Sequence, residues 1–94
     1  MNEAEFELAG LLGLPRNRYK GGKDFLKAAL RAAKEEKFEV VERRDPESEK
    51  ILVLEVWHGA RQLDVRELAA EAEIPGAILV GLIAAIRKHR RLPP

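Results

Sequence analysis

The chain has 94 residues, of which 46% are hydrophobic and 35% charged, and its formal net charge is +1, so we expect one folded domain over residues 1–94. The absence of cysteine excludes disulfides, thiolate nucleophiles and cysteine-ligated metals, and favours a cytoplasmic location. The acidic N-terminus is unlike a signal peptide, and the longest apolar run, residues 74–86, is well short of the ~20 residues that span a bilayer, so no membrane partner is expected.

Two helices are predicted in the N-terminal part of the chain. Asn2 is placed to cap the first helix, with Glu5 three residues later to complete a capping box, and Gly13 is expected to end it. Asp24 is expected to cap a second, alanine-rich helix with one apolar face. We expect this second helix to run to about Glu36.

A β-hairpin is predicted next, from strands at residues 38–44 and 51–58. The Asp45-Pro46 pair between them is typical of a type I turn. Both faces of the second strand are largely apolar, and Trp57 lies on the second face. Since a two-stranded hairpin is marginally stable alone, we expect a helix or another subunit to cover the face with Trp57.

Two more helices are predicted in the C-terminal part of the chain. Asp64 and Glu67 match a second capping box and predict a helix over residues 64–73. Residues 74–76 are expected to form a turn, and residues 77–90 the last helix. The predicted fold is therefore α+β, in the order helix, helix, hairpin, helix, helix.

No arrangement of residues indicates catalysis. Ser48 lies in the hairpin turn without a base beside it, and His58 and His89 are far apart in the sequence with no nearby metal ligands. No phosphate-binding glycine motif follows a predicted strand. We therefore expect no enzymatic activity, no cofactor and no bound metal.

Residues 64–90, DVRELAAEAEIPGAILVGLIAAIRKHR, resemble the helix-turn-helix of DNA-binding proteins. The order helix, loop, helix, hairpin over residues 5–58 is similar to a winged-helix domain. The resemblance implies two packed helices and a nucleic-acid partner, although Glu73 replaces the turn glycine of the family. The positions that match the packing pattern of the family are Leu68, Ala69, Ala72, Ile74, Leu79 and Leu82.

The last predicted helix lacks the side chains of a recognition helix. Its outward positions are small or apolar, so they cannot read bases by hydrogen bonding. A helix that is apolar nearly all round is buried or pairs with another helix. We therefore interpret it as core and as a homodimer interface, through Ile78, Val80, Ile83 and Ala84.

Basic residues concentrate in residues 15–34, where seven Lys and Arg accompany one acid, Asp24. Tyr19 could stack on a base, and the backbone amides of Gly21 and Gly22, at a helix N-terminus, could approach a phosphate. We predict a nucleic-acid surface of low sequence specificity that reads mainly the phosphate backbone. The residues predicted to form it are Arg16, Arg18, Tyr19, Lys20, Lys23, Lys27 and Arg31.

An alternative interpretation of the same residues remains open. The basic stretch could be a solvated helix face, or it could pair with acidic segments such as residues 3–7. The chain would then be a homodimeric protein–protein interaction module. The composition itself, without threonine and with one glutamine among many charged residues, is typical of thermophiles.

Overall fold

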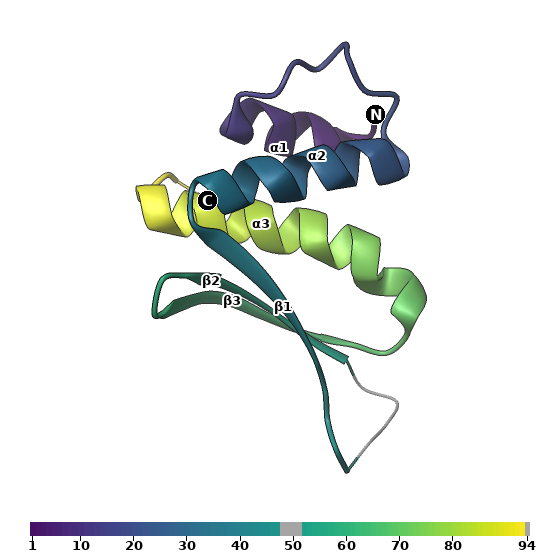
Figure 1. The fold of residues 1–94 in the computed structure, drawn as a ribbon, viewed down its shortest axis with the longest axis vertical. Helices are drawn as coiled ribbons and strands as arrows, with labels where there is room; N and C mark the ends of the chain where they lie inside the picture. Colours follow the sequence, from purple (N-terminus) through teal and green to yellow (C-terminus); the bar gives the residue numbers. More distant parts are fainter. Residues whose placement is uncertain (48–51, 94) are drawn as a thin grey trace.

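The computed structural model describes residues 1–47 and 52–93 and shows three α-helices with a three-stranded antiparallel sheet (Figure 1). The predicted α+β class is confirmed. No helix within these residues is long and apolar enough to cross a membrane. The elements in chain order are α1 (Glu3–Leu12), α2 (Gly22–Glu35), β1 (Phe38–Arg44), β2 (Leu52–His58), β3 (Arg61–Leu68), a short 3-10 helix η1 (Glu71–Glu73) and α3 (Ile74–Arg90).

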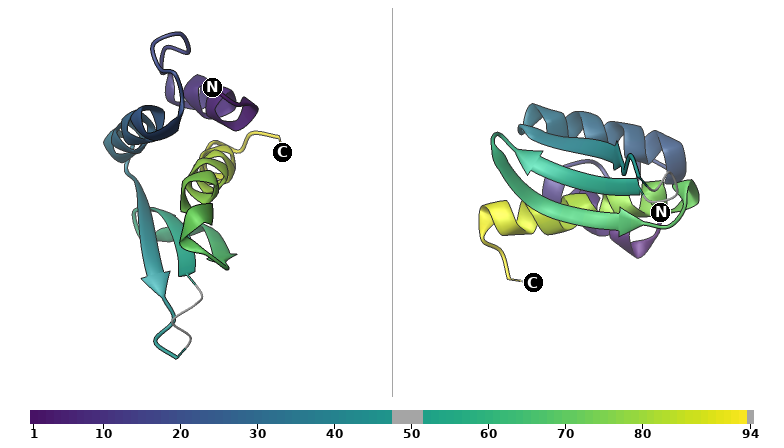
Figure 2. Two further views of the ribbon diagram at one scale, coloured as in Figure 1. Left: turned by 90° about the vertical axis from the view of Figure 1, so that its right-hand side faces the viewer. Right: turned by 90° about the horizontal axis from the view of Figure 1, so that it is seen from below.

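All three helices lie on one side of the sheet (Figures 1 and 2). Helix α3 packs on β2 and β3, and α1 contacts α3 on the side away from the sheet. Helix α2 contacts β1 and both other helices. The core lies between these layers, and its largest fully buried side chains are Phe25, Leu8, Leu54, Leu82, Ile86 and Val56.

The start of α1 follows the sequence prediction, whereas the start of α2 does not. Asn2 and Glu5 form the expected capping box, with two reciprocal bonds of 2.8 Å between side chain and backbone nitrogen. Helix α2 begins at Gly22, two residues before the predicted cap Asp24. The reason is a contact between distant segments, since the Glu5 carboxylate accepts a 2.8 Å hydrogen bond from the Gly22 amide.

The predicted hairpin is present as β1 and β2. Their register pairs Phe38 with His58 and Arg44 with Leu52. In the turn, the Glu47 amide donates a 2.9 Å hydrogen bond to the Asp45 carboxylate. The rest of the predicted turn, including Ser48, lies outside the described residues, as does the first predicted residue of the second strand.

The predicted third helix over residues 64–73 is wrong, because most of it is the strand β3 and the short helix η1. Strand β3 pairs with β2 along its length, and this pairing gives the hairpin its third strand. Asp64 does not cap a helix; it accepts a 2.8 Å bond from Arg66. Residues 64–90, which resemble a helix-turn-helix, are therefore strand, 3-10 helix and α-helix, and no feature of residues 1–47 and 52–93 identifies a winged-helix domain.

Helix α3 begins at Ile74, so the predicted turn at residues 74–76 belongs to its first turn. Proline is tolerated there because its missing N–H would have no partner within the helix. Further along, α3 approaches the sheet closely at Gly81. A Cβ at this position would lie 3.2 Å from Oδ2 of Asp64 and 3.3 Å from Cγ2 of Val56.

The sheet face opposite the helices is not covered by any described element (Figure 2). Trp57 lies on this face and is half-buried; no described helix covers it, and the cover by another subunit stays a prediction. Its indole N–H donates a 2.9 Å hydrogen bond to Glu55, which also accepts one of 2.9 Å from Arg43. Val65 on the neighbouring strand is 50% exposed.

Candidate nucleic-acid interface

The outer face of α2 carries four exposed cations, Lys23, Lys27, Arg31 and Lys34, which we call the α2 basic surface. Three of them follow each other at intervals of four residues, which places them on one side of the helix. No ion pair joins any of the four to an acid in the described part of the chain. These four cations are therefore exposed to solvent and form no ion pair within the described residues.

The loop before α2 divides the predicted residues into two groups. Arg18 and Lys20 are exposed and extend the α2 basic surface. Arg16 instead places its guanidinium over the ring of Phe6 on α1, with Cζ 4.9 Å from the ring centroid. Tyr19 is half-buried and packs edge-on against Phe25, with ring centroids 6.0 Å apart.

The first amide of α2 is already bonded to an acid. The Gly22 amide already donates to the Glu5 carboxylate, and Glu5 is only 5% exposed. A Cβ on Gly21 would lie 3.1 Å from both oxygens of this carboxylate. An incoming phosphate would meet a negative charge at close range, so we leave the start of α2 out of the candidate interface.

Two of the acids that could have neutralised the α2 basic surface are bound elsewhere. Glu7 pairs with Arg87, and Glu36 pairs with Arg90 at 2.9 Å. Arg90 also donates a 2.7 Å hydrogen bond to the carbonyl of Leu11. The basic end of α3 therefore ties α1 and the end of α2 together, and these acids do not cover the α2 basic surface.

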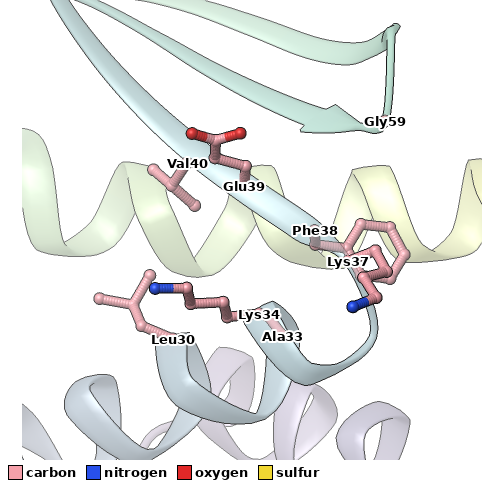
Figure 3. Close-up of a pocket in the computed structure, with 8 residues that line it drawn as sticks. All are labelled: Leu30, Ala33, Lys34, Lys37, Phe38, Glu39, Val40 and Gly59. Carbon is pink, nitrogen blue, oxygen red and sulfur yellow. The ribbon is translucent and has the colours of Figure 1, made fainter.

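An open groove of about 660 Å³ lies between α2 and β1 (Figure 3). Its apolar lining includes Leu30 and Val40, and Lys34 reaches over it from the helix. Lys37, which also lines it, has a left-handed backbone with φ of 71°. The other residues around the groove are Ala33, Phe38, Glu39 and Gly59.

Neither a family model, nor a curated protein, nor a solved structure matches this chain. Its surface chemistry is therefore the basis for a functional proposal.

The two histidines lie together, which sequence spacing did not reveal. Their rings stack with centroids 3.9 Å apart, and both contact the ring of Phe38 edge-on. The His58 Nε2 atom lies 3.1 Å from the carbonyl oxygen of Glu36. Residues 1–47 and 52–93 contain no group of three metal-ligating side chains, so the pair has no third ligand nearby.

The residues predicted for a dimer interface on α3 differ in exposure. Ile78 is only 5% exposed and belongs to the core. Val80 is 44% exposed, whereas Ile83 and Ala84 are partly buried. One exposed valine is a small apolar area, and single exposed apolar side chains are common on protein surfaces.

Proposed function

We propose that this protein binds nucleic acid without catalysing a reaction, and that the α2 basic surface contacts the phosphate backbone. The observation that supports this proposal is a row of four exposed cations, without acid partners in residues 1–47 and 52–93, along one helix. Such a row binds a polyanion by releasing the counterions condensed on it. Arg18 and Lys20 in the preceding loop extend the same positive field.

The side chains of α2 favour binding without sequence specificity. Bases are read in the major groove by bidentate contacts, often from Arg, Asn or Gln. Helix α2 contains no Asn or Gln, and its exposed charged side chains are mostly those that contact phosphates. We therefore expect similar affinity for unrelated sequences.

A salt series on labelled DNA and RNA tests the proposal. Fluorescence anisotropy should show binding at low salt to oligonucleotides of unrelated sequence. If Lys23, Lys27 and Arg31, which lie in one row, each meet one phosphate, the slope of log affinity against log salt should approach about −2.7 on duplex DNA, at roughly −0.9 per contact. Fewer simultaneous contacts give a shallower slope.

Charge reversal distinguishes the contribution of the α2 basic surface to binding from the contribution of the overall net charge. Lys27→Glu with Arg31→Glu should weaken binding to every sequence and flatten the salt slope by about 2. The matched control is Arg61→Glu with Lys88→Glu, which makes the same change in net charge at exposed residues elsewhere. Absent binding at low salt, or equal losses in the two variants, would refute the proposal.

A further inference from the structure

Strand β1 is an edge strand, because the order of the sheet is β1-β2-β3. One side of its backbone pairs with β2, and no described strand pairs with the other side. An edge of this kind is a template for a further strand. The groove between α2 and β1 lies beside this edge, so an added strand has space beneath α2.

The charges of β1 are complementary to those of a second copy of β1. An antiparallel pair centred on Val41 places Glu39 opposite Arg43 of the second copy, and the same pair occurs twice by symmetry. Arg43 bonds to Glu55 through Nε, and no described residue accepts a bond from its terminal nitrogens. Phe38 falls opposite Arg44, whose guanidinium already pairs with Glu71 of its own chain.

In the same register, a side chain of the second copy enters the groove between α2 and β1. Val40 lines the groove, and the residue opposite Val40 is Glu42 of the second copy. Directly opposite side chains in an antiparallel pair lie on the same face of the sheet. Glu42 of the second copy therefore points into the groove, where the Lys34 ammonium lies (Figure 3).

The other edge of the sheet lacks these features. Strand β3 also carries charges of both signs, but Asp64 and Arg66 bond to each other within the strand at 2.8 Å. The groove lies beside β1 and includes no residue of β3. The β1 edge therefore combines complementary charges with an adjacent groove, and the β3 edge does not.

We propose that two copies of the chain associate through β1, antiparallel and centred on Val41, so that their sheets join into one continuous sheet. Glu39 with Arg43, and Glu42 with Lys34, are the charge pairs that set the register. This interface differs from the one predicted on α3, and it does not depend on nucleic-acid binding. Because the twofold axis is perpendicular to the sheet, both α2 helices lie on the same face of the dimer.

Sedimentation equilibrium over micromolar to millimolar concentrations tests the proposal. The wild type should be a dimer in reversible exchange with monomer. Glu39→Lys places Lys opposite Arg43, and Glu42→Lys places it near Lys34, so each should weaken association by about tenfold or more. Glu35→Lys is the control, since it makes the same charge change on the flank of α2 away from the groove.

A charge exchange identifies the partner of Glu42. Lys34→Glu alone should weaken association, and the double variant Lys34→Glu, Glu42→Lys should restore it, because both side chains are exposed and form no ion pair within the described chain. Circular dichroism confirms that each variant folds. A wild type that stays monomeric throughout, or a dimer that is indifferent to Glu39→Lys and to the exchange, would overturn the β1 interface.

Discussion

The Glu5 carboxylate accepts a 2.8 Å hydrogen bond from the backbone amide of Gly22 and joins the first turns of two helices. The other oxygen of the same carboxylate accepts from the Asn2 amide. Helix N-termini leave amide donors without partners, and a carboxylate there also interacts favourably with the helix dipole. Glu5 thus accepts hydrogen bonds at the N-termini of both α1 and α2, and this is why an acid is buried between the two helices.

Replacing Glu5 should destabilise the fold through both helices. Glu5→Ala leaves two amides without their acceptor, and we expect a loss of about 1–3 kcal/mol in the free energy of unfolding. Glu5→Gln keeps one side-chain oxygen and should lose less. Urea denaturation followed by circular dichroism measures both. Glu3→Ala, at an exposed position of the same turn, should cost only a few tenths of a kcal/mol; equal losses for Glu3 and Glu5 would contradict the double cap.

The stability of the uncovered sheet face should depend on pH through Glu55. The Arg43 guanidinium and then the Trp57 indole hold the pKa of this carboxyl below its ordinary value of 4.5. A pKa lowered by folding contributes stability above the unfolded pKa, and that contribution is lost as pH falls through the folded pKa. Glu55→Gln should therefore be less stable than wild type at neutral pH, with the difference shrinking in acid. A difference in urea midpoint that is constant with pH would contradict this assignment.

Lys37 should be replaceable by glycine with a gain in stability. Its φ of 71° places an L-residue in the left-handed region, at a cost of about 1–2 kcal/mol. Glycine removes this cost but has more freedom in the unfolded chain, worth about 0.4–1 kcal/mol. We expect Lys37→Gly to raise the free energy of unfolding by about 0.5–1 kcal/mol in urea titrations. Arg31→Gly, inside α2, should lower it by about 1 kcal/mol; a loss in both variants would show that Lys37 is not strained.

Two glycines of α3 should respond in opposite directions to alanine. No neighbouring atom lies within 4 Å of a Cβ added at Gly76, so Gly76→Ala should stabilise the helix by about 0.5–1 kcal/mol. At Gly81 the added methyl meets Val56 and Asp64 at 3.2–3.3 Å. We expect crowding against the sheet to exceed the helical gain and lower stability by about 1 kcal/mol. Thermal unfolding compares the two, and a gain at Gly81 would show that α3 can move away.

Features that depend on neighbours in sequence were predictable. The capping box of Asn2 and Glu5 is local, and the cations of α2 repeat at helical spacing. The pattern of Asp64 and Glu67 is equally local, but it fits a strand as well as a helix start. Pairing with β2 determines the outcome there, because tertiary contacts override weak local preferences.

Contacts between distant segments were not predictable. The bond from Gly22 to Glu5 and the stack of His58 on His89 each join segments that are distant in the chain. A single sequence gives spacing along the chain, and neither of these two contacts has a spacing that helix or strand geometry would indicate. This is why helical spacing could place the cations on one exposed face of α2, whereas the bond between Glu5 and Gly22 could not be predicted.

Helix α3 is the last element of the chain and lies between the sheet and α1 (Figure 1). During synthesis, α1, α2 and the strands leave the ribosome before the segment that packs against all of them. The nascent chain therefore exposes Leu8 and Leu54, which α3 helps to bury, until residues 74–90 have left the ribosome. Domains fold as units, and unfolded chains with exposed apolar surface aggregate. The core is consequently completed only once α3 has been made, and the interval before that is when the nascent chain most needs a chaperone.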